Sequence, residues 1–221
     1  MKHIHVCALS LVFVFHTYCR GQNKPDLSKE NSKSETKHIV TSPRSNGSSI
    51  HTKYEYTDSI GERLIIQNGL PRGGLKYTDP NGKVYVYAIF WTRIINETAN
   101  PFRFTIDFPA DSFELPSSPG RYFKLFLPSD TMTFEKEHLF NYGLPELKSF
   151  LDKGLQKASS LKRTINPKGS SAFYVVTLFN RGVDGTLRTE LSLKGQNLFY
   201  RINGKEIHCG SINLKNLMLR K

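Results

Sequence analysis

The stretch from Lys83 to Asn96 constrains the fold of this chain more than any other. Side chains alternate between the two faces of a β-strand, and here both sets of positions are largely apolar or aromatic. One set comprises Val84, Val86, Ala88, Phe90, Thr92 and Ile94, and the other comprises Tyr85, Tyr87, Ile89, Trp91, Arg93 and Ile95. A strand with two apolar faces must be covered on both sides, so we expect it at the centre of a sheet within a layered fold.

Turn signals divide the residues after Tyr54 into short strand-like segments. Asp79-Pro80-Asn81-Gly82 precedes the central strand, and Asn203-Gly204 predicts a tight hairpin, because an Asn-Gly pair adopts positive φ at low cost. Phe102–Phe108 alternates apolar with polar residues, which is typical of a strand with one core face. The expected strands cover residues 53–57, 62–67, 83–96, 102–108, 122–127, 172–180, 186–193, 197–202 and 205–214.

One segment has helical periodicity instead. Its apolar residues recur at helical spacing, namely Leu144, Leu147, Leu151, Leu155 and Ala158. Pro145 suits a first helical position. The predicted fold is therefore mainly β, an antiparallel β-sandwich with one inserted α-helix at about residues 144–162.

Two stretches resemble bacterial immunoglobulin-like modules. One runs from strand to strand through Ile94-Ile95-Asn96-Glu97-Thr98 and Pro101, over residues 94–108. The other is Ile165-Asn166-Pro167-Lys168-Gly169, which leads into Phe173-Tyr174-Val175-Val176. The resemblance implies an immunoglobulin-like sandwich, although the chain lacks the Cys…Trp…Cys arrangement of antibody domains. A likeness of this kind concerns the fold and implies no function.

The N-terminus has the layout of a secretory signal. Lys2, His3 and His5 form a short basic start, and the apolar run Val6 to Phe15 follows. This run is shorter than the roughly 20 residues that a membrane-spanning helix needs. We expect residues 1–19 to be a signal peptide, and the protein to be exported to the periplasm or to the outer membrane and cell surface.

The residues from Cys19 onward, Cys-Arg-Gly-Gln-Asn-Lys-Pro, resemble the start of Bacteroidota envelope lipoproteins. The resemblance implies a lipid anchor on Cys19. Thr17 and Tyr18 depart from the small residues that usually precede a lipidated cysteine. Two alternatives therefore stay open, a lipidated Cys19 and an export signal after which Cys19 is discarded or left free.

Composition and charge divide the remaining chain. Residues 20–53 are rich in Ser, Lys, Asn and Thr, which predicts a disordered tether, and residues 54–221 are predicted to form one β-sandwich domain. The net charge is +12. The excess lies at the two ends: residues 20–53 carry seven Lys/Arg against three acids, and residues 181–221 carry eight against three. A nucleic-acid binder would concentrate basic residues in one folded patch, so we expect no nucleic-acid partner.

No set of residues predicts catalysis, a cofactor or a metal site. His208 and Cys209 are adjacent, so on a strand they point to opposite faces and cannot easily share a metal ion. We expect Cys209 to be a small buried residue and His208 to lie on the surface. A Gly-x-Ser-x-Gly nucleophile motif does not occur in the sequence.

Three triplets resemble the Asp-Ser/Thr-apolar sites that Bacteroidota O-glycosylate on exported proteins. They are Asp58-Ser59-Ile60, Asp111-Ser112-Phe113 and Asp130-Thr131-Met132. The resemblance makes Ser59, Ser112 and Thr131 candidate O-glycosylation sites.

The aromatic residues Tyr85, Tyr87 and Trp91 share one face of the expected central strand. A flat aromatic row can bind sugar rings or a protein partner, which makes these residues a candidate binding face. The alternative, which we favour, is that they form core beneath the predicted helix.

These observations predict an exported, non-enzymatic binding or assembly module of the cell envelope. Its partner would be an envelope protein or glycan, and it would contact a membrane only through a lipid anchor. The alternative is a hydrolase or a carbohydrate-processing accessory domain whose site lies on the loops.

Overall fold

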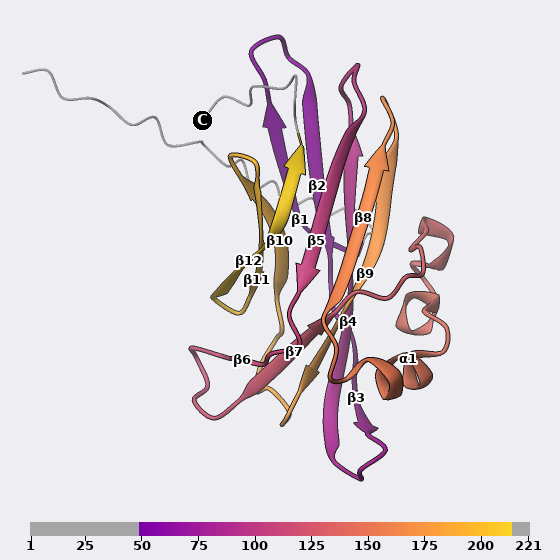
Figure 1. The fold of residues 1–221 in the computed structure, drawn as a ribbon, viewed down its shortest axis with the longest axis vertical. Helices are drawn as coiled ribbons and strands as arrows, with labels where there is room; N and C mark the ends of the chain where they lie inside the picture. The colour runs from indigo at the N-terminus through magenta and orange to yellow at the C-terminus, as the bar shows by residue number, and fades with distance from the viewer. Residues whose placement is uncertain (1–48, 214–221) are drawn as a thin grey trace, which may run out of the picture. The chain divides into compact units, whose positions relative to one another are not determined.

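The computed structural model describes residues 49–213, and these form a mainly β fold with two antiparallel sheets and one α-helix (Figure 1). The predicted β-sandwich with one helix is therefore confirmed. The predicted signal peptide, Cys19 and most of the predicted tether lie outside the described residues. The first strand begins at Ile50, inside the stretch 20–53 that composition assigned to the tether. Within residues 49–213, no helix has the length and apolarity needed to cross a membrane.

The first sheet has seven strands, and β4 lies inside it. Its order is β1 (Ile50–Thr57), β2 (Arg63–Gly69), β4 (Val84–Asn96), β9 (Ser170–Phe179), β7 (Tyr122–Phe126) and β6 (Phe113–Glu114), and β3 (Arg72–Thr78) also pairs with β4. The second sheet has five strands. Its order is β10 (Thr189–Lys194), β11 (Asn197–Ile202), β12 (Lys205–Asn213), β5 (Phe102–Phe108) and β8 (Ser159–Ile165).

The strand β4 has the central position that its two apolar faces predict. It pairs with β9 from Val86↔Phe179 to Ile95↔Ser170 and with β2 and β3 on its other side. Ala88, Phe90 and Ile94 lie in the core between the two sheets. The opposite face carries Tyr85, Tyr87, Ile89 and Trp91, which belong to a second core.

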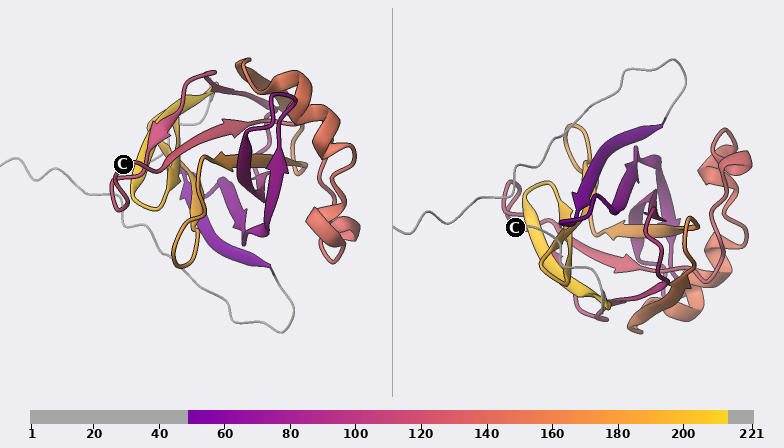
Figure 2. Two further views of the ribbon diagram at one scale, coloured as in Figure 1. Left: turned by 90° about the horizontal axis from the view of Figure 1, so that it is seen from below. Right: turned by 90° about the horizontal axis from the view of Figure 1, so that it is seen from above.

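The second core lies between the outer face of the first sheet and the connection from β7 to β8. This connection contains the 3₁₀ helices η1 (Phe134–Lys136) and η2 (Phe140–Gly143) and the helix α1 (Leu147–Gly154). Figure 2 shows these elements on one side of the molecule, with β10, β11 and β12 on the other. We call residues 128–158 the cover segment, because Met132, Tyr142, Leu151 and Leu155 pack on the sheet.

The predicted helical range of 144–162 is wrong at both ends. Glu146 has a left-handed backbone conformation (φ 48°), so the helix begins only at Leu147. At the other end, Ser159 starts β8, which pairs with β5 from Phe108↔Ser159 to Phe102↔Ile165. Tertiary pairing with β5 thus replaces the last turns of the predicted helix.

The strand β3 was not predicted, because its sequence lacks alternation. Gly73 and Gly74 have positive φ (114° and 76°), and the register with β4 shifts between Gly73 and Leu75. A Cβ atom on Gly73 would lie 2.9 Å from the carbonyl oxygen of Tyr87, so only glycine fits this irregularity.

Candidate functional site

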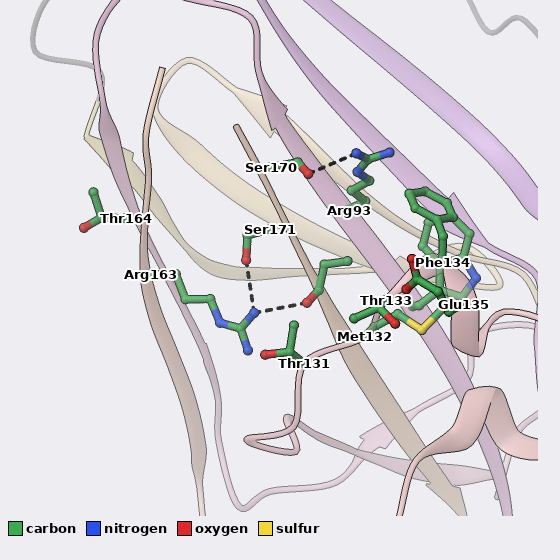
Figure 3. A pocket seen from close by; sticks show the side chains of 12 residues that line it. Arg93, Thr131, Met132, Thr133, Phe134, Glu135, Arg163, Thr164, Ser170 and Ser171 are labelled. Carbon is green, nitrogen blue, oxygen red and sulfur yellow. Dashed lines mark hydrogen bonds between the residues drawn. The ribbon is translucent and has the colours of Figure 1, made fainter. Parts of the chain in front are cut away.

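A cleft of about 490 Å³ lies where β8 and β9 separate into different sheets (Figure 3). The two strands are consecutive in the chain, but β8 pairs with β5 in the second sheet and β9 pairs with β4 in the first. The start of the cover segment, residues 131–135, closes one side. We call this space the β8–β9 cleft; it is lined by Trp91, Arg93, Thr131, Met132, Thr133, Phe134, Glu135, Arg163, Thr164, Ser170, Ser171 and Ala172.

Arg93 reaches the cleft from β4 and is held on two sides. It is half-buried, and its Nη2 donates a hydrogen bond of 3.0 Å to Ser170 Oγ. Its guanidinium also lies 4.5 Å from the centre of the Phe134 ring, which is a cation–π contact. Burial lowers the pKa of Arg93, but an arginine stays charged in proteins.

Arg163 reaches the cleft from β8, at a position that faces the core. Leu161 and Ile165, two residues before and after it on the same face, are buried in the core between the sheets. Arg163 Nη1 donates hydrogen bonds of 3.1 Å to Ser171 Oγ and to the carbonyl oxygen of Ala172. Burial lowers the pKa of this half-buried guanidinium as well.

Neither guanidinium has a carboxylate partner within residues 49–213. The ion pairs of arginine in this part of the chain involve Arg63, Arg121 and Arg201 instead. Glu135 also lines the cleft, but it is exposed, and a hydrogen bond with the Thr133 side chain is the main cause that lowers its pKa. The cleft therefore holds two positive charges whose hydrogen-bond acceptors among the described residues are neutral oxygens, and one negative charge at its border.

The two arginines lie on either side of β9. Ser170 and Ser171 are consecutive, so their side chains point to opposite faces of the strand. Ser170 pairs with Ile95 on the outer face that also carries Arg93, whereas Ser171 pairs with Ile94 of the core between the sheets. The cleft thus wraps around the N-terminal end of β9, as Figure 3 shows.

Hydroxyl groups and an aromatic wall complete the lining. Thr131, Thr133 and Thr164 are exposed and add hydroxyls to those of the two serines. Trp91 and Phe134 meet edge to face, with ring centroids 6.1 Å apart. A concave site with an apolar wall and a few convergent polar groups is typical of ligand binding.

Tyr85, Tyr87 and Trp91 form core, as the favoured interpretation has it, and not an exposed binding face, because these residues are only 9, 7 and 1% exposed. They pack in the core beneath the cover segment. Trp91 reaches the wall of the β8–β9 cleft, and its Nε1 donates a hydrogen bond of 3.1 Å to Ser49 Oγ. Tyr85, Tyr87 and Trp91 are buried because the whole cover segment, and not α1 alone, packs on this face of the sheet.

The three candidate O-glycosylation residues, Ser59, Ser112 and Thr131, are all exposed in turns or connections between strands. Thr131 also lines the cleft. Cys19, the candidate for lipidation, lies outside the described residues.

Cys209 is 2% exposed, and burial raises the pKa of its thiol to about 12. His208 is exposed, and its ring contacts Phe199. Among residues 49–213, no group of three or more His, Cys, Asp or Glu side chains could hold a metal ion.

None of the sequence-based predictions includes Arg93, Arg163, Ser170 or Ser171 as site residues. One signal in the sequence does point to the arginines. Each occupies a position of its strand that alternation assigns to an apolar face, Arg93 two residues after Trp91 and Arg163 between Leu161 and Ile165. A charged residue at such a position needs a specific reason. No family model, curated protein or solved structure matches the chain.

Proposed function

We propose that the protein is an exported, non-enzymatic binding module of the cell envelope, and that the β8–β9 cleft is its ligand site. The observation that carries this proposal is the pair of half-buried arginines in a cleft built on three strands, without a carboxylate partner among the described residues. Export is supported by the N-terminal sequence, and a lipid anchor would depend on Cys19.

The chemistry of the lining favours binding over catalysis. The hydroxyls of Ser170 and Ser171 accept hydrogen bonds from arginines, and a protonated guanidinium cannot remove a proton from a serine. A serine nucleophile needs a base within hydrogen-bonding reach. The strands hold the polar groups in fixed positions, which suits recognition of a ligand.

A variant that fills the cleft without changing its charge tests this proposal. Thr131→Trp places a large side chain at the exposed border of the cleft. Ser112→Trp, on the exposed connection between β5 and β6, is the matched control. The purified full-length protein would be applied to arrays of neutral, cationic and anionic oligosaccharides and peptides. We expect binding that Thr131→Trp abolishes and Ser112→Trp retains. The proposal fails if nothing binds, or if Thr131→Trp binds as the wild type does.

A further inference from the structure

The guanidiniums of Arg93 and Arg163 have N–H donors to spare. Arg93 donates one hydrogen bond to a described residue, and Arg163 donates two, both from Nη1. An arginine carries further N–H groups in a planar fork whose geometry matches the two oxygens of a carboxylate or of a sulfate. Partial burial strengthens such contacts, because less water competes for the same donors. The cleft therefore suits a ligand that carries oxyanions.

The hydroxyl groups of the lining favour a sugar as the carrier of these oxyanions. Thr131 and Thr164 each offer an O–H that can both donate and accept, whereas the Thr133 O–H already bonds Glu135 and leaves its oxygen to accept. Sugar hydroxyls have the same double capacity, so a polyhydroxylated chain can exchange hydrogen bonds with them in either direction.

An extended peptide fits less well, because the edge of β9 at the cleft is already occupied. Peptides that add to a sheet need free backbone N–H and C=O groups along an edge strand. Here the carbonyl oxygen of Ala172 accepts a hydrogen bond from Arg163, and Thr131 forms an isolated β-bridge with Phe173. The backbone ladder that a peptide would use is thus interrupted by this chain's own groups.

The placement of the arginines on either side of β9 sets a second requirement for the ligand, which is the number of its acidic groups. Arg93 and Ser170 lie on the outer face of the strand, whereas Arg163 and Ser171 lie on the inner face. A ligand with one acidic group can satisfy one of these pairs. A ligand with acidic groups on more than one sugar can satisfy both at once.

We infer that the β8–β9 cleft binds an acidic oligosaccharide, with one carboxylate or sulfate group at Arg93 and Ser170 and a second at Arg163 and Ser171. This inference rests on the proposed function, since it assigns a ligand class to the same site. Glu135 limits the affinity, because its carboxylate faces the same cleft as the ligand's acidic groups.

The test is calorimetric titration of the full-length protein at low salt with four probes. Trigalacturonate carries carboxylates, a sulfated galactan trisaccharide carries sulfates, maltotriose is neutral, and triglutamate is an acidic peptide. We expect one or both of the acidic sugars to bind and the neutral sugar and the peptide to bind at least tenfold more weakly. The comparison of the two acidic sugars identifies which oxyanion the site prefers.

Charge variants locate the binding. Arg93→Gln and Arg163→Gln keep a hydrogen-bond donor but remove the charge, and each should lower the affinity for the acidic sugar about tenfold. Arg163→Lys keeps the charge but loses the planar fork, so its affinity should lie between those of the wild type and Arg163→Gln. Glu135→Gln should raise the affinity.

Arg181→Gln is the control. It removes a charge from an exposed residue after the far end of β9, and it should leave the affinity unchanged. Thermal unfolding of each variant verifies that it is folded.

Three outcomes would overturn the inference: no binding of either acidic sugar, equal binding of maltotriose or triglutamate, or equal affinities for the Arg→Gln variants and Arg181→Gln. The proposed function is distinguished by the cleft-filling variant. If Thr131→Trp blocks a ligand whose affinity the arginine variants leave unchanged, the cleft remains the binding site and the acidic ligand class is wrong.

Discussion

Side chains connect both edge strands of the second sheet, β10 and β8, to the first sheet, but they come from opposite sheets. Asn68 of β2 reaches the backbone of β10, whereas Arg163 of β8 reaches β9. At β10, the amide of Asn68 accepts a hydrogen bond of 2.8 Å from the backbone N–H of Leu191 and donates one of 3.2 Å to its carbonyl oxygen. The same amide also bonds Thr52 and Thr92. At β8, a charged arginine reaches across and keeps donors to spare.

The difference shows how one sandwich can have a closed edge and an open one. Asn68 is 1% exposed, and its amide replaces the missing backbone neighbour of β10. A neutral amide can be buried once its hydrogen bonds are made, whereas a guanidinium must stay near water or near an anion. The β10 edge can therefore close over the core, while the β8 edge remains a cleft. Four variants test this difference between the two edges.

The largest effect is expected for Asn68→Leu. This variant leaves the backbone N–H and C=O of Leu191 without their partner in a buried site, and each unsatisfied group costs about 1–3 kcal/mol. We expect a loss of about 3 kcal/mol or more in the free energy of unfolding, measured with urea. Asn197→Leu, at an exposed position of β11, is the control and should stay within about 0.5 kcal/mol of the wild type. Equal losses for the two variants would show that the amide does not close this edge.

A smaller effect is expected for Tyr56→Phe at the same edge. The Tyr56 hydroxyl accepts a hydrogen bond of 2.8 Å from the buried N–H of Leu193. Its removal should cost about 1–2 kcal/mol, measured in the same way. Tyr122→Phe, at an exposed tyrosine of β7, should cost almost nothing, and a Tyr56→Phe protein as stable as this control would contradict the prediction.

Arg163→Leu should change stability less, and it separates stability from binding. A leucine here would bury apolar surface between Leu161 and Ile165, which offsets the loss of two hydrogen bonds of about 1 kcal/mol each. We expect the free energy of unfolding to change by less than about 1 kcal/mol, while calorimetry shows loss of trigalacturonate binding or of sulfated-sugar binding. A large loss of stability would mean that Arg163 serves the fold rather than a ligand.

The smallest effect concerns pH and the charges near β10. A hydrogen bond from Lys194 lowers the pKa of Glu206 below its ordinary value of 4.5, with Arg201 as a further partner. The stabilisation from these pairs is present above pH 4.5 and is lost as the pH falls through the lower pKa of the folded state. Glu206→Gln should therefore reduce stability by less than about 1 kcal/mol at pH 7 and converge with the wild type at acidic pH. Parallel stability curves of the two proteins down to pH 3 would exclude this linkage.

The sequence predicted the features that depend on neighbouring residues. Asp79 accepts hydrogen bonds from the backbone N–H groups of Asn81 and Lys83, so the turn lies where its residues indicated. Asn203 and Gly204 have positive φ, as the predicted hairpin requires. The length of α1 could not be predicted, because Leu155 and Ala158 continue the helical spacing although β8 starts at Ser159 and pairs with β5. The cleft could not be predicted either, because Arg93 and Arg163 are distant in sequence. Only the folded chain brings them to the two faces of β9.

The class of fold, the central place of β4 and the positions of the main turns thus follow from the amino-acid sequence. The reason is that strand alternation and turn residues express the covalent geometry of the backbone within a few positions. Which edge closes and which stays open depends instead on how the two sheets pack. Asn68 and Arg163 are both polar residues amid apolar ones, and their roles depend on partners far away in the chain, Leu191 for one and Ser171 for the other. A polar group at such a position acts through its long-range partners, and these are set by packing of the two sheets rather than by local sequence.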